Sequence, residues 1–424
     1  MNRVARAIAA AVLLAGASIG MASETRELHL PGRTDVSIAI EPAKGDSLLL
    51  WLPSGIPVAS HDADIARRIA ALGIEVWRPD VLDAHFLPNL ESSLAQVPDG
   101  DIVALIDAAR ATGKRVALVA AAHAAALALR GAHAWQVQHP GDRDLVGTIL
   151  LHPYLYLGPP QPGCDAVFHP VVHSTSLPVV IVQPGNSPTR FRVDALRAAL
   201  EQGGARVHVE LLAGVRDRYY FRADATSAED AEAARLPARL KDALAGMLAG
   251  NQQAGQQPAK TPPPSAPAAG APPVNRGLQP YQGDPSAPAL ALAGLDGRRY
   301  DLARYRGRVV LVNFWASWCP PCVREMPSMQ RLKQKLRGKP FSILAVNTAE
   351  SPQDVRAFLT RHGIDLPVMI DADGSTIKRW KVFVFPTSYV IDAEGRIRLG
   401  VYGEVAWDEA DAVGKISALL PEMR

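Results

Sequence analysis

Residues 313–329 read NFWASWCPPCVREMPSM, and this stretch decides the fold of the carboxyl-terminal half of the chain. It begins inside the apolar run 308–315, whose continuous hydrophobicity predicts a buried central strand. The residues after the second cysteine, 323–336, have helical character. Cys319 and Cys322 therefore form a Cys-x-x-Cys motif between a strand and a helix. In a chain with three cysteines, this arrangement indicates a redox-active dithiol rather than a disulfide-built scaffold.

The flanking sequence predicts further strands and a capped helix. A second strand, 341–347, precedes a helix with Ser351 as N-cap and Pro352 as its first residue, ending near His362 before Gly363. Apolar strands are expected at 385–392 and 397–402, across an Asp-x-x-Gly turn. A Cys-x-x-Cys motif can also be half of a zinc site, but no second Cys or His pair at ligand spacing follows in this half.

Three segments together carry a family resemblance: NFWASWCPPCVREMPSM, DVRAFLTRHGIDLPVMIDADG and FPTSYVIDAEGRI. They resemble the TlpA/ResA-like thiol-disulfide oxidoreductases of bacterial envelopes. The resemblance implies a thioredoxin-like fold for 285–424 and protein-disulfide reductase activity that needs no cofactor.

The roles of the motif residues follow from position and from the resemblance. Cys319 is expected at an exposed helix N-terminus, where the helix dipole favours the attacking thiolate, and Cys322 is expected to be buried and to resolve the mixed disulfide. Glu325 matches the acid of the family pattern C-x-x-C-x-x-E-x-P, which implies a partly buried carboxyl that shuttles protons. The alternative is an exposed first-turn Glu. Asn313 stands where ordinary thioredoxins have an Asp, which leaves Glu325 as the nearest acid in sequence.

The Phe385-Pro386-Thr387 segment is the candidate substrate-binding site. Pro386 matches the family's cis-proline, which faces the dithiol and lets the neighbouring backbone pair with an extended substrate. The alternative is an ordinary trans proline at a strand start. Phe385 departs from the small or β-branched residue expected there. Trp318 is expected beside the exposed sulfur, and Trp315 in the core.

The residues between the cysteines predict a reducing pair. Pro320 and Pro321 lack the N–H groups that would otherwise stabilise the Cys319 thiolate, and no cationic side chain lies between the cysteines. A less stabilised reduced form donates electrons more readily. A disulfide oxidase or isomerase is the alternative.

The amino-terminal half alternates strand-like and helix-like stretches. Strands are expected at 47–52, 74–77, 115–119, 146–151, 178–183 and 206–211, and helices at 62–72, 100–112, 122–131 and 192–202. This alternation predicts a doubly wound, mainly parallel sheet. Residues 24–249 resemble an α/β-hydrolase-like domain. The fold class is therefore α/β in both halves.

The catalytic positions of that hydrolase fold are vacant in this chain. Ala122 follows the strand 115–119 where the family has its nucleophilic serine. The segment 184–188 offers no acid, and the loop 213–218 offers no histidine. We therefore expect a non-catalytic binding or scaffolding domain. An active hydrolase, with His123 as an unusual nucleophile, is the alternative.

One amino-terminal cluster invites a metal hypothesis. Cys164, His169 and His173 lie within ten residues, with His152 upstream, and such side chains can bind copper or zinc. Pro170 and three prolines before it mark an irregular loop, which favours an ordinary loop thiol instead. An intermolecular disulfide through Cys164 is a further possibility.

The first residues read as an export signal. Arg3 and Arg6 precede an uncharged apolar stretch from Ala7 to Ala22, and small residues flank Met21. Residues 1–23 are thus a predicted signal peptide, with a retained membrane anchor as the alternative. We expect a periplasmic protein, in an oxidising compartment.

Residues 250–284 are rich in Pro, Ala, Gln and Gly, and we expect them to be a disordered linker. The net charge of +3 gives no case for binding nucleic acid. The resemblance implies disulfide-containing envelope proteins as substrates, including apocytochromes c, and a membrane thiol donor of the DsbD/CcdA type as the electron source.

Overall fold

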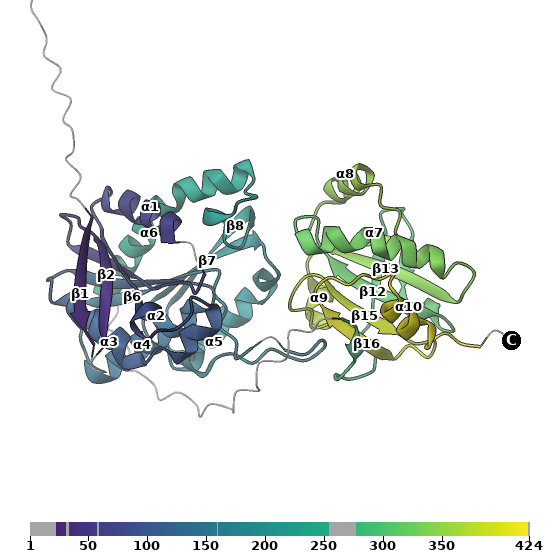
Figure 1. Ribbon diagram of the computed structural model, residues 1–424, viewed down its shortest axis with the longest axis horizontal. Coiled ribbons are helices and arrows are strands. Elements are labelled where there is room, and N and C mark those ends of the chain that lie inside the picture. The colour runs from purple at the N-terminus through teal and green to yellow at the C-terminus, as the bar shows by residue number, and fades with distance from the viewer. Residues whose placement is uncertain (1–22, 31–33, 57–58, 159, 254–276, 423–424) are drawn as a thin grey trace, which may run out of the picture.

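The computed structural model describes residues 23–30, 34–56, 59–158, 160–253 and 277–422, which form two domains lying side by side (Figure 1). The predicted signal peptide lies outside the described residues except for Ser23, and so does 254–276, the greater part of the predicted linker. Among the residues that are described, no helix is long and apolar enough to cross a membrane.

The amino-terminal domain is built on a sheet whose described strands follow the order β1-β2-β4-β3-β5-β6-β7-β8. Its strands are β1 (Glu24–His29), β2 (Asp35–Glu41), β3 (Ser47–Trp51), β4 (Glu75–Pro79), β5 (Arg115–Ala121), β6 (Leu145–Leu151), β7 (Val179–Asn186) and β8 (Val207–Arg216). Strands β3 to β8 pair in parallel, whereas β2 pairs antiparallel with both β1 and β4. The predicted parallel sheet is confirmed, with an antiparallel pair of strands added at one edge.

Helices cover both faces of this sheet, as expected for a doubly wound arrangement (Figure 1). They are α1 (Ala59–Ala70), α2 (Val81–Ala84), α3 (Asp99–Arg110), α4 (Ala124–Gln138), α5 (Val193–Gly203) and α6 (Ser227–Gln253). Residues of α3, α4 and α5 share one apolar core, and residues of α1 and α6 share a second. The two cores lie on opposite faces of the sheet because alternate residues of a strand, such as Leu48 and Leu49, belong to different cores.

The carboxyl-terminal domain has a thioredoxin-like sheet in the order β14-β13-β12-β15-β16-β9. Its strands are β9 (Gln279–Pro280), β12 (Val309–Trp315), β13 (Phe341–Thr348), β14 (Val368–Asp371), β15 (Thr387–Ile391) and β16 (Ile397–Tyr402), and β10 (Ala291–Ala293) and β11 (Arg299–Asp301) form a separate pair. Strands β12, β13 and β14 are parallel, and β15 runs antiparallel to β12. Every residue of β12 is buried, as predicted for a central strand.

Helices α7 (Pro320–Lys335), α8 (Pro352–His362), α9 (Ser375–Arg379) and α10 (Ala410–Ser417) complete this domain. The predicted caps of α8 are confirmed: Ser351 accepts a hydrogen bond from the amide of Asp354, and Gly363 follows the helix with a positive φ of 63°. The sharp end of α8 lets the chain return to the sheet as β14.

The predicted linker boundaries of 250 and 284 need correction. Helix α6 continues to Gln253, and β9 already pairs with β16 at the edge of the second sheet. The side chain of Leu278 is also buried in the core of the carboxyl-terminal domain. Both ends of the predicted linker therefore belong to the folded domains.

Candidate functional site

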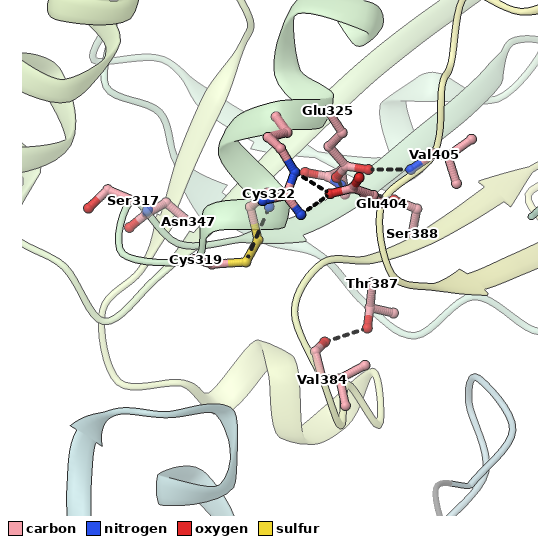
Figure 2. The surroundings of a disulfide bond; sticks show 12 residues. Ser317, Cys319, Cys322, Glu325, Asn347, Val384, Thr387, Ser388, Glu404 and Val405 are labelled. Atoms are coloured by element: carbon pink, nitrogen blue, oxygen red, sulfur yellow. Dashed lines mark hydrogen bonds and ion pairs between the residues drawn. A yellow bond between two sulfur atoms is a disulfide. The ribbon is translucent and has the colours of Figure 1, made fainter. Parts of the chain in front are cut away.

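Strand β12 and helix α7 place the two cysteines at the carboxyl end of the central strand. Cys319 occupies the N-cap position of α7, and its sulfur forms a disulfide of 2.11 Å with that of Cys322 (Figure 2). The amide of Cys322 donates a hydrogen bond of 3.3 Å to Sγ of Cys319. The positive end of the helix dipole therefore points at Cys319, which favours its thiolate form once the disulfide is reduced.

The structure corrects the expected exposure of Cys319. The residue is only 4% exposed in this oxidised state, and Cys322 is fully buried. The reason is that Cys319 belongs to the apolar cluster that contains Phe385, with Trp318 packed against it. The rings of Trp318 and Phe385 lie 5.7 Å apart. The sulfur of the predicted nucleophile is thus shielded by neighbouring side chains.

Glu325 lies one helical turn beyond Cys322, on the same helix, and is 3% exposed. The interpretation of this residue as an exposed first-turn Glu is therefore wrong. Its Oε2 accepts hydrogen bonds of 3.1 Å from the amide of Val405 and from Nε1 of Trp407. Burial raises the pKa of this carboxyl to about 8, against the opposing effect of these hydrogen bonds. At neutral pH the group is mostly protonated in the disulfide form.

Asn313 provides the other partner of this carboxyl. Its side-chain amide donates 2.8 Å to Oε1 of Glu325 and 2.9 Å to Oγ of Ser388. Asn313 and Ser388 face each other across the β12–β15 pair, so strand register brings them together. An amide at this position satisfies the buried acid without adding a second ionisable group.

The Phe385–Pro386 peptide bond is cis, which confirms the predicted cis-proline. Thr387 Oγ1 donates 2.6 Å to the carbonyl of Val384 and closes the turn around this bond. The carbonyl of Pro386 accepts 2.9 Å from the amide of Gly403 in the adjacent segment. Figure 2 shows Val384 and Thr387 on one side of the disulfide and Glu325 on the other in this view. The structure thus brings the two cysteines, Glu325 and the cis-proline segment into one site.

One acidic residue near the site was missed by sequence reasoning. Glu350 follows β13, and its carboxylate accepts hydrogen bonds from the amide of Ser317 at 2.7 Å and from Nδ2 of Asn347 at 2.6 Å. It also accepts from the hydroxyl of Ser317. These bonds fix the turn that leads from β12 to Cys319. Its position after a predicted strand could have pointed to Glu350. Because β12 and β13 are parallel neighbours, their carboxyl ends meet at one edge of the sheet.

The vacant nucleophile position of the amino-terminal domain keeps an unusual backbone. Ala122 lies between β5 and α4 with a φ of 48°, a left-handed value that is costly for a residue with a Cβ. Beside it, His123 Nδ1 lies 3.3 Å from the carboxylate of Glu91. Asp217 is half-buried, accepts 2.8 Å from Ser187 Oγ, and has its pKa raised to about 6 by desolvation of the carboxyl. The vacant position itself carries only the methyl group of Ala122.

The side chains weighed as possible metal ligands in this domain do not come together among the described residues. The described residues contain no group of three or more His, Cys, Asp or Glu side chains that could hold a metal ion. His169 is engaged as a cap, accepting from the amide of Val171, and His152 is buried near Tyr220. Cys164 is a half-buried free thiol. The metal hypothesis has no geometric support in this part of the chain.

Known proteins match the carboxyl-terminal domain. Residues 282–416 match the Redoxin family model. The thiol-disulfide oxidoreductase ResA of Geobacillus thermodenitrificans (strain NG80-2) is 36% identical over 124 residues, covering 29% of this chain and 71% of the relative. ResA of Bacillus subtilis (strain 168) is 33% identical over 111 residues, covering 26% of this chain and 62% of the relative.

A crystal structure of a thiol:disulfide interchange protein of the thioredoxin family from Chlorobium tepidum TLS is 28% identical, with a TM-score of 0.29, and covers 32% of this chain and 97% of that chain. The ResA alignments and the Redoxin match both fall on the domain that carries the disulfide, the buried acid and the cis-proline. Through this domain, the chain belongs to the ResA-type thiol-disulfide oxidoreductases.

Proposed function

We propose that this protein is an exported reductant of disulfides in envelope proteins. The observation that carries the proposal is the disulfide at the N-terminus of α7, with the buried carboxyl of Glu325 one turn beyond it. In this proposal Cys319 attacks, Cys322 resolves and Glu325 moves the proton. The cis-proline segment, with Trp318 beside it, receives the substrate.

The first half of the reaction transfers one substrate sulfur to the protein. The Cys319 thiolate attacks one sulfur of the substrate disulfide, and a new S–S bond forms as the substrate bond breaks. The leaving substrate thiolate takes up a proton. Substrate backbone paired with the residues beside Pro386 would hold the attacked sulfur in line.

The second half releases the reduced substrate. Glu325, as carboxylate, accepts the proton of the Cys322 thiol, and the resulting thiolate attacks Sγ of Cys319. The second substrate thiolate leaves. The substrate disulfide has then been reduced by two electrons, and Cys319 and Cys322 have been oxidised to a disulfide. Burial raises the pKa of the Glu325 carboxyl to about 8, which makes it a better proton acceptor than an ordinary carboxylate. A membrane dithiol donor of the DsbD/CcdA type would then restore the reduced pair.

The reducing direction is supported by the surroundings of Cys319. The first two residues of α7 are prolines, so the amide of Cys322 is the first helix N–H able to reach the Cys319 sulfur. Where the Glu325 carboxyl ionises, its negative charge also disfavours a second negative charge on the pair. Both features leave the thiolate form less stabilised than the helix dipole together with further amide donors would make it, which favours electron donation over electron uptake.

Export and substrate class rest on sequence and family. The positively charged start and apolar stretch of residues 1–23 support delivery to the periplasm. Apocytochromes c, whose haem-binding cysteines must be reduced, are the substrates that the family resemblance favours.

For the amino-terminal domain we propose a non-catalytic α/β-hydrolase-like scaffold. Its support is the largely parallel sheet and the left-handed backbone of Ala122 at a strand-to-helix turn, the geometry that presents a nucleophile in such enzymes. Because Ala122 has no nucleophilic atom, the domain would orient a partner rather than cleave an ester.

Trapping of reaction partners in cells tests the proposed function. Cys322→Ala stops the reaction at the mixed disulfide, so cysteine-containing envelope proteins should be captured through Cys319. The matched control is Cys319→Ala/Cys322→Ala, which should capture none of them. Capture of cytosolic proteins, or equal capture by the control, would contradict the proposal.

A further inference from the structure

The two domains contact each other through an aromatic cluster formed by Tyr154, Tyr156 and Phe383. Phe383 of the carboxyl-terminal domain is 1% exposed. Its ring meets those of Tyr156 and Tyr154 edge-on, with centroid distances of 4.8 and 6.0 Å. The guanidinium of Arg192 lies 5.2 Å from the Phe383 ring centroid, and its Nη2 donates 3.2 Å to the carbonyl of Val382. An aromatic side chain of one domain is therefore buried among residues of the other.

The reverse contact is made by Phe191. This residue precedes Arg192 in the amino-terminal domain, yet it belongs to the apolar core of the carboxyl-terminal domain. A Cβ added to Gly374 would come within 2.3 Å of the Phe191 ring. Lys381 and Asp165 add an ion pair of 2.8 Å between exposed side chains, which contributes little. Two aromatic insertions in opposite directions fix how the domains meet.

The aromatic cluster covers the vacant nucleophile position of the amino-terminal domain. The amide of Tyr154 donates 3.0 Å to the carbonyl of Ala122, and the Tyr154 ring stacks on that of His123 at 4.3 Å. Phe383 then packs on Tyr154. The surface where a hydrolase would admit its substrate is occupied by the other domain of the same chain.

The contacted segment leads directly to the cis-proline. Phe383 is followed by Val384, whose carbonyl accepts from Thr387, and by Phe385, whose ring lies 5.7 Å from Trp318. The segment from Phe383 to Phe385 is thus held by the amino-terminal domain at one end and by the dithiol site at the other. Figure 2 shows the Val384–Thr387 turn between the disulfide and the pale blue ribbon of the amino-terminal domain.

We propose that the amino-terminal domain pre-organises the cis-proline segment for substrate, and that Phe383, Tyr156 and Arg192 are positioning residues for thiol–disulfide exchange. An extended substrate pairs with backbone beside the cis-proline, so any freedom in this segment must be lost on docking. The interdomain contacts remove that freedom before substrate arrives. The inference rests on thiol–disulfide exchange at Cys319, and not on the direction of electron flow.

The test compares variants of the full-length chain with the parent protein. Arg192→Ala is the first variant, because Arg192 is half-buried and lies outside the apolar cores of the two domains. Hydrogen exchange of residues 380–388 should become about fivefold faster. The KM for a protein disulfide should rise about fivefold while kcat stays within about twofold. The redox potential should not move, because Asn313 and Glu325 are untouched. The matched control is Arg110→Ala, which removes a guanidinium placed 4.9 Å from the Trp135 ring inside the amino-terminal domain and should change none of these values.

A double-mutant cycle separates this contact from general destabilisation. Tyr156→Ala and Phe383→Ala should each raise the KM, and the double variant should raise it no further than either single change. If hydrogen exchange and the KM are unchanged in Arg192→Ala, the inference is overturned. A lowered KM would also overturn it, because it would show that the amino-terminal domain obstructs the substrate. A failure of the proposed reducing function shows instead in the redox potential of the unmodified protein.

Discussion

Asn313 and Glu325 are joined by a hydrogen bond of 2.8 Å that connects the strand before the dithiol to the helix after it. Both residues are buried, and the amide donates to a carboxyl whose pKa burial raises to about 8. The site therefore contains a buried carboxyl, Glu325, that can hold or release a proton near Cys322, and its hydrogen-bond donor Asn313 cannot itself titrate. The first three predictions follow from this relationship.

Glu325→Gln should slow the resolution of a mixed disulfide on the order of 10²-fold, because the proton acceptor for Cys322 is removed. The rate of resolution in the parent protein should rise with pH through about 8 as the carboxyl ionises, and this step should vanish from the variant's profile. Single-turnover kinetics from pH 6 to 9.5 measures both. Glu404→Gln, which removes a neighbouring carboxyl that is 46% exposed, should keep the pH-dependent step and move it slightly to lower pH, because the Glu404 charge raises the pKa of Glu325.

The stability of the disulfide form should fall with rising pH because of the same group. The folded carboxyl keeps its proton up to a pKa of about 8, whereas in the unfolded chain the proton leaves near the ordinary pKa of 4.5. The unfolded state therefore binds fewer protons in this window, and the unfolding free energy drops by about 1.4 kcal/mol per pH unit from this group. In urea denaturation, the unfolding free energy of Glu325→Gln should change less from pH 5 to 8 than that of the parent protein. Identical slopes in the two proteins would contradict the burial of Glu325.

Asn313→Asp should destabilise the protein at alkaline pH, because it places a second carboxyl where the amide donates to Glu325. Two carboxyls at hydrogen-bond distance share one proton, and losing it leaves buried like charges. We expect a loss of about 3 kcal/mol at pH 9 and a smaller loss at pH 6, measured by urea denaturation. Ser388→Ala removes the other hydrogen bond of Asn313 without adding a charge, and should cost about 1 kcal/mol at both pH values.

The sequence predicted those parts of the fold whose signal is local. The apolar run of β12, the Cys-x-x-Cys motif, the Ser351-Pro352 start of α8 and the proline of the Phe385–Pro386 bond all lie within short segments. Strand β1 was missed because it is an edge strand with mostly exposed side chains and therefore has no apolar run. Helix α6 was missed although Leu236, Leu240, Leu244 and Met247 recur at helical spacing, because exposed alanines between them weaken the contrast and Pro237 lies inside the helix.

The parts of the site that depend on long-range packing could not be predicted. The burial of Glu325 depends on Val405 and Trp407, some eighty positions further along the chain. The low exposure of Cys319 depends on Phe385. Glu350 reaches Ser317 only because two parallel strands end at the same edge. The contact of Phe383 with Tyr156 joins two domains whose sequences carry no sign of it.

Ala122→Gly should stabilise the amino-terminal domain, since glycine adopts a φ of 48° without the steric cost that a Cβ imposes. We expect a gain of up to about 1 kcal/mol in thermal or urea unfolding. Ala121→Gly, in the adjacent strand residue, should instead cost about 1 kcal/mol. A loss of stability in Ala122→Gly similar to that in Ala121→Gly would show that the left-handed turn is absent.

The redox potential of the Cys319–Cys322 pair, measured by equilibration with glutathione or dithiothreitol buffers, tests the central claim most directly. Among the described residues, the Cys319 sulfur accepts one hydrogen bond, from the amide of Cys322, and the first two residues of the helix are prolines, which have no N–H to offer. We therefore expect a value on the reducing side, near the roughly −270 mV of thioredoxin. A value at or above about −150 mV, close to that of a strong disulfide oxidant, would contradict the account of this protein as a reductant.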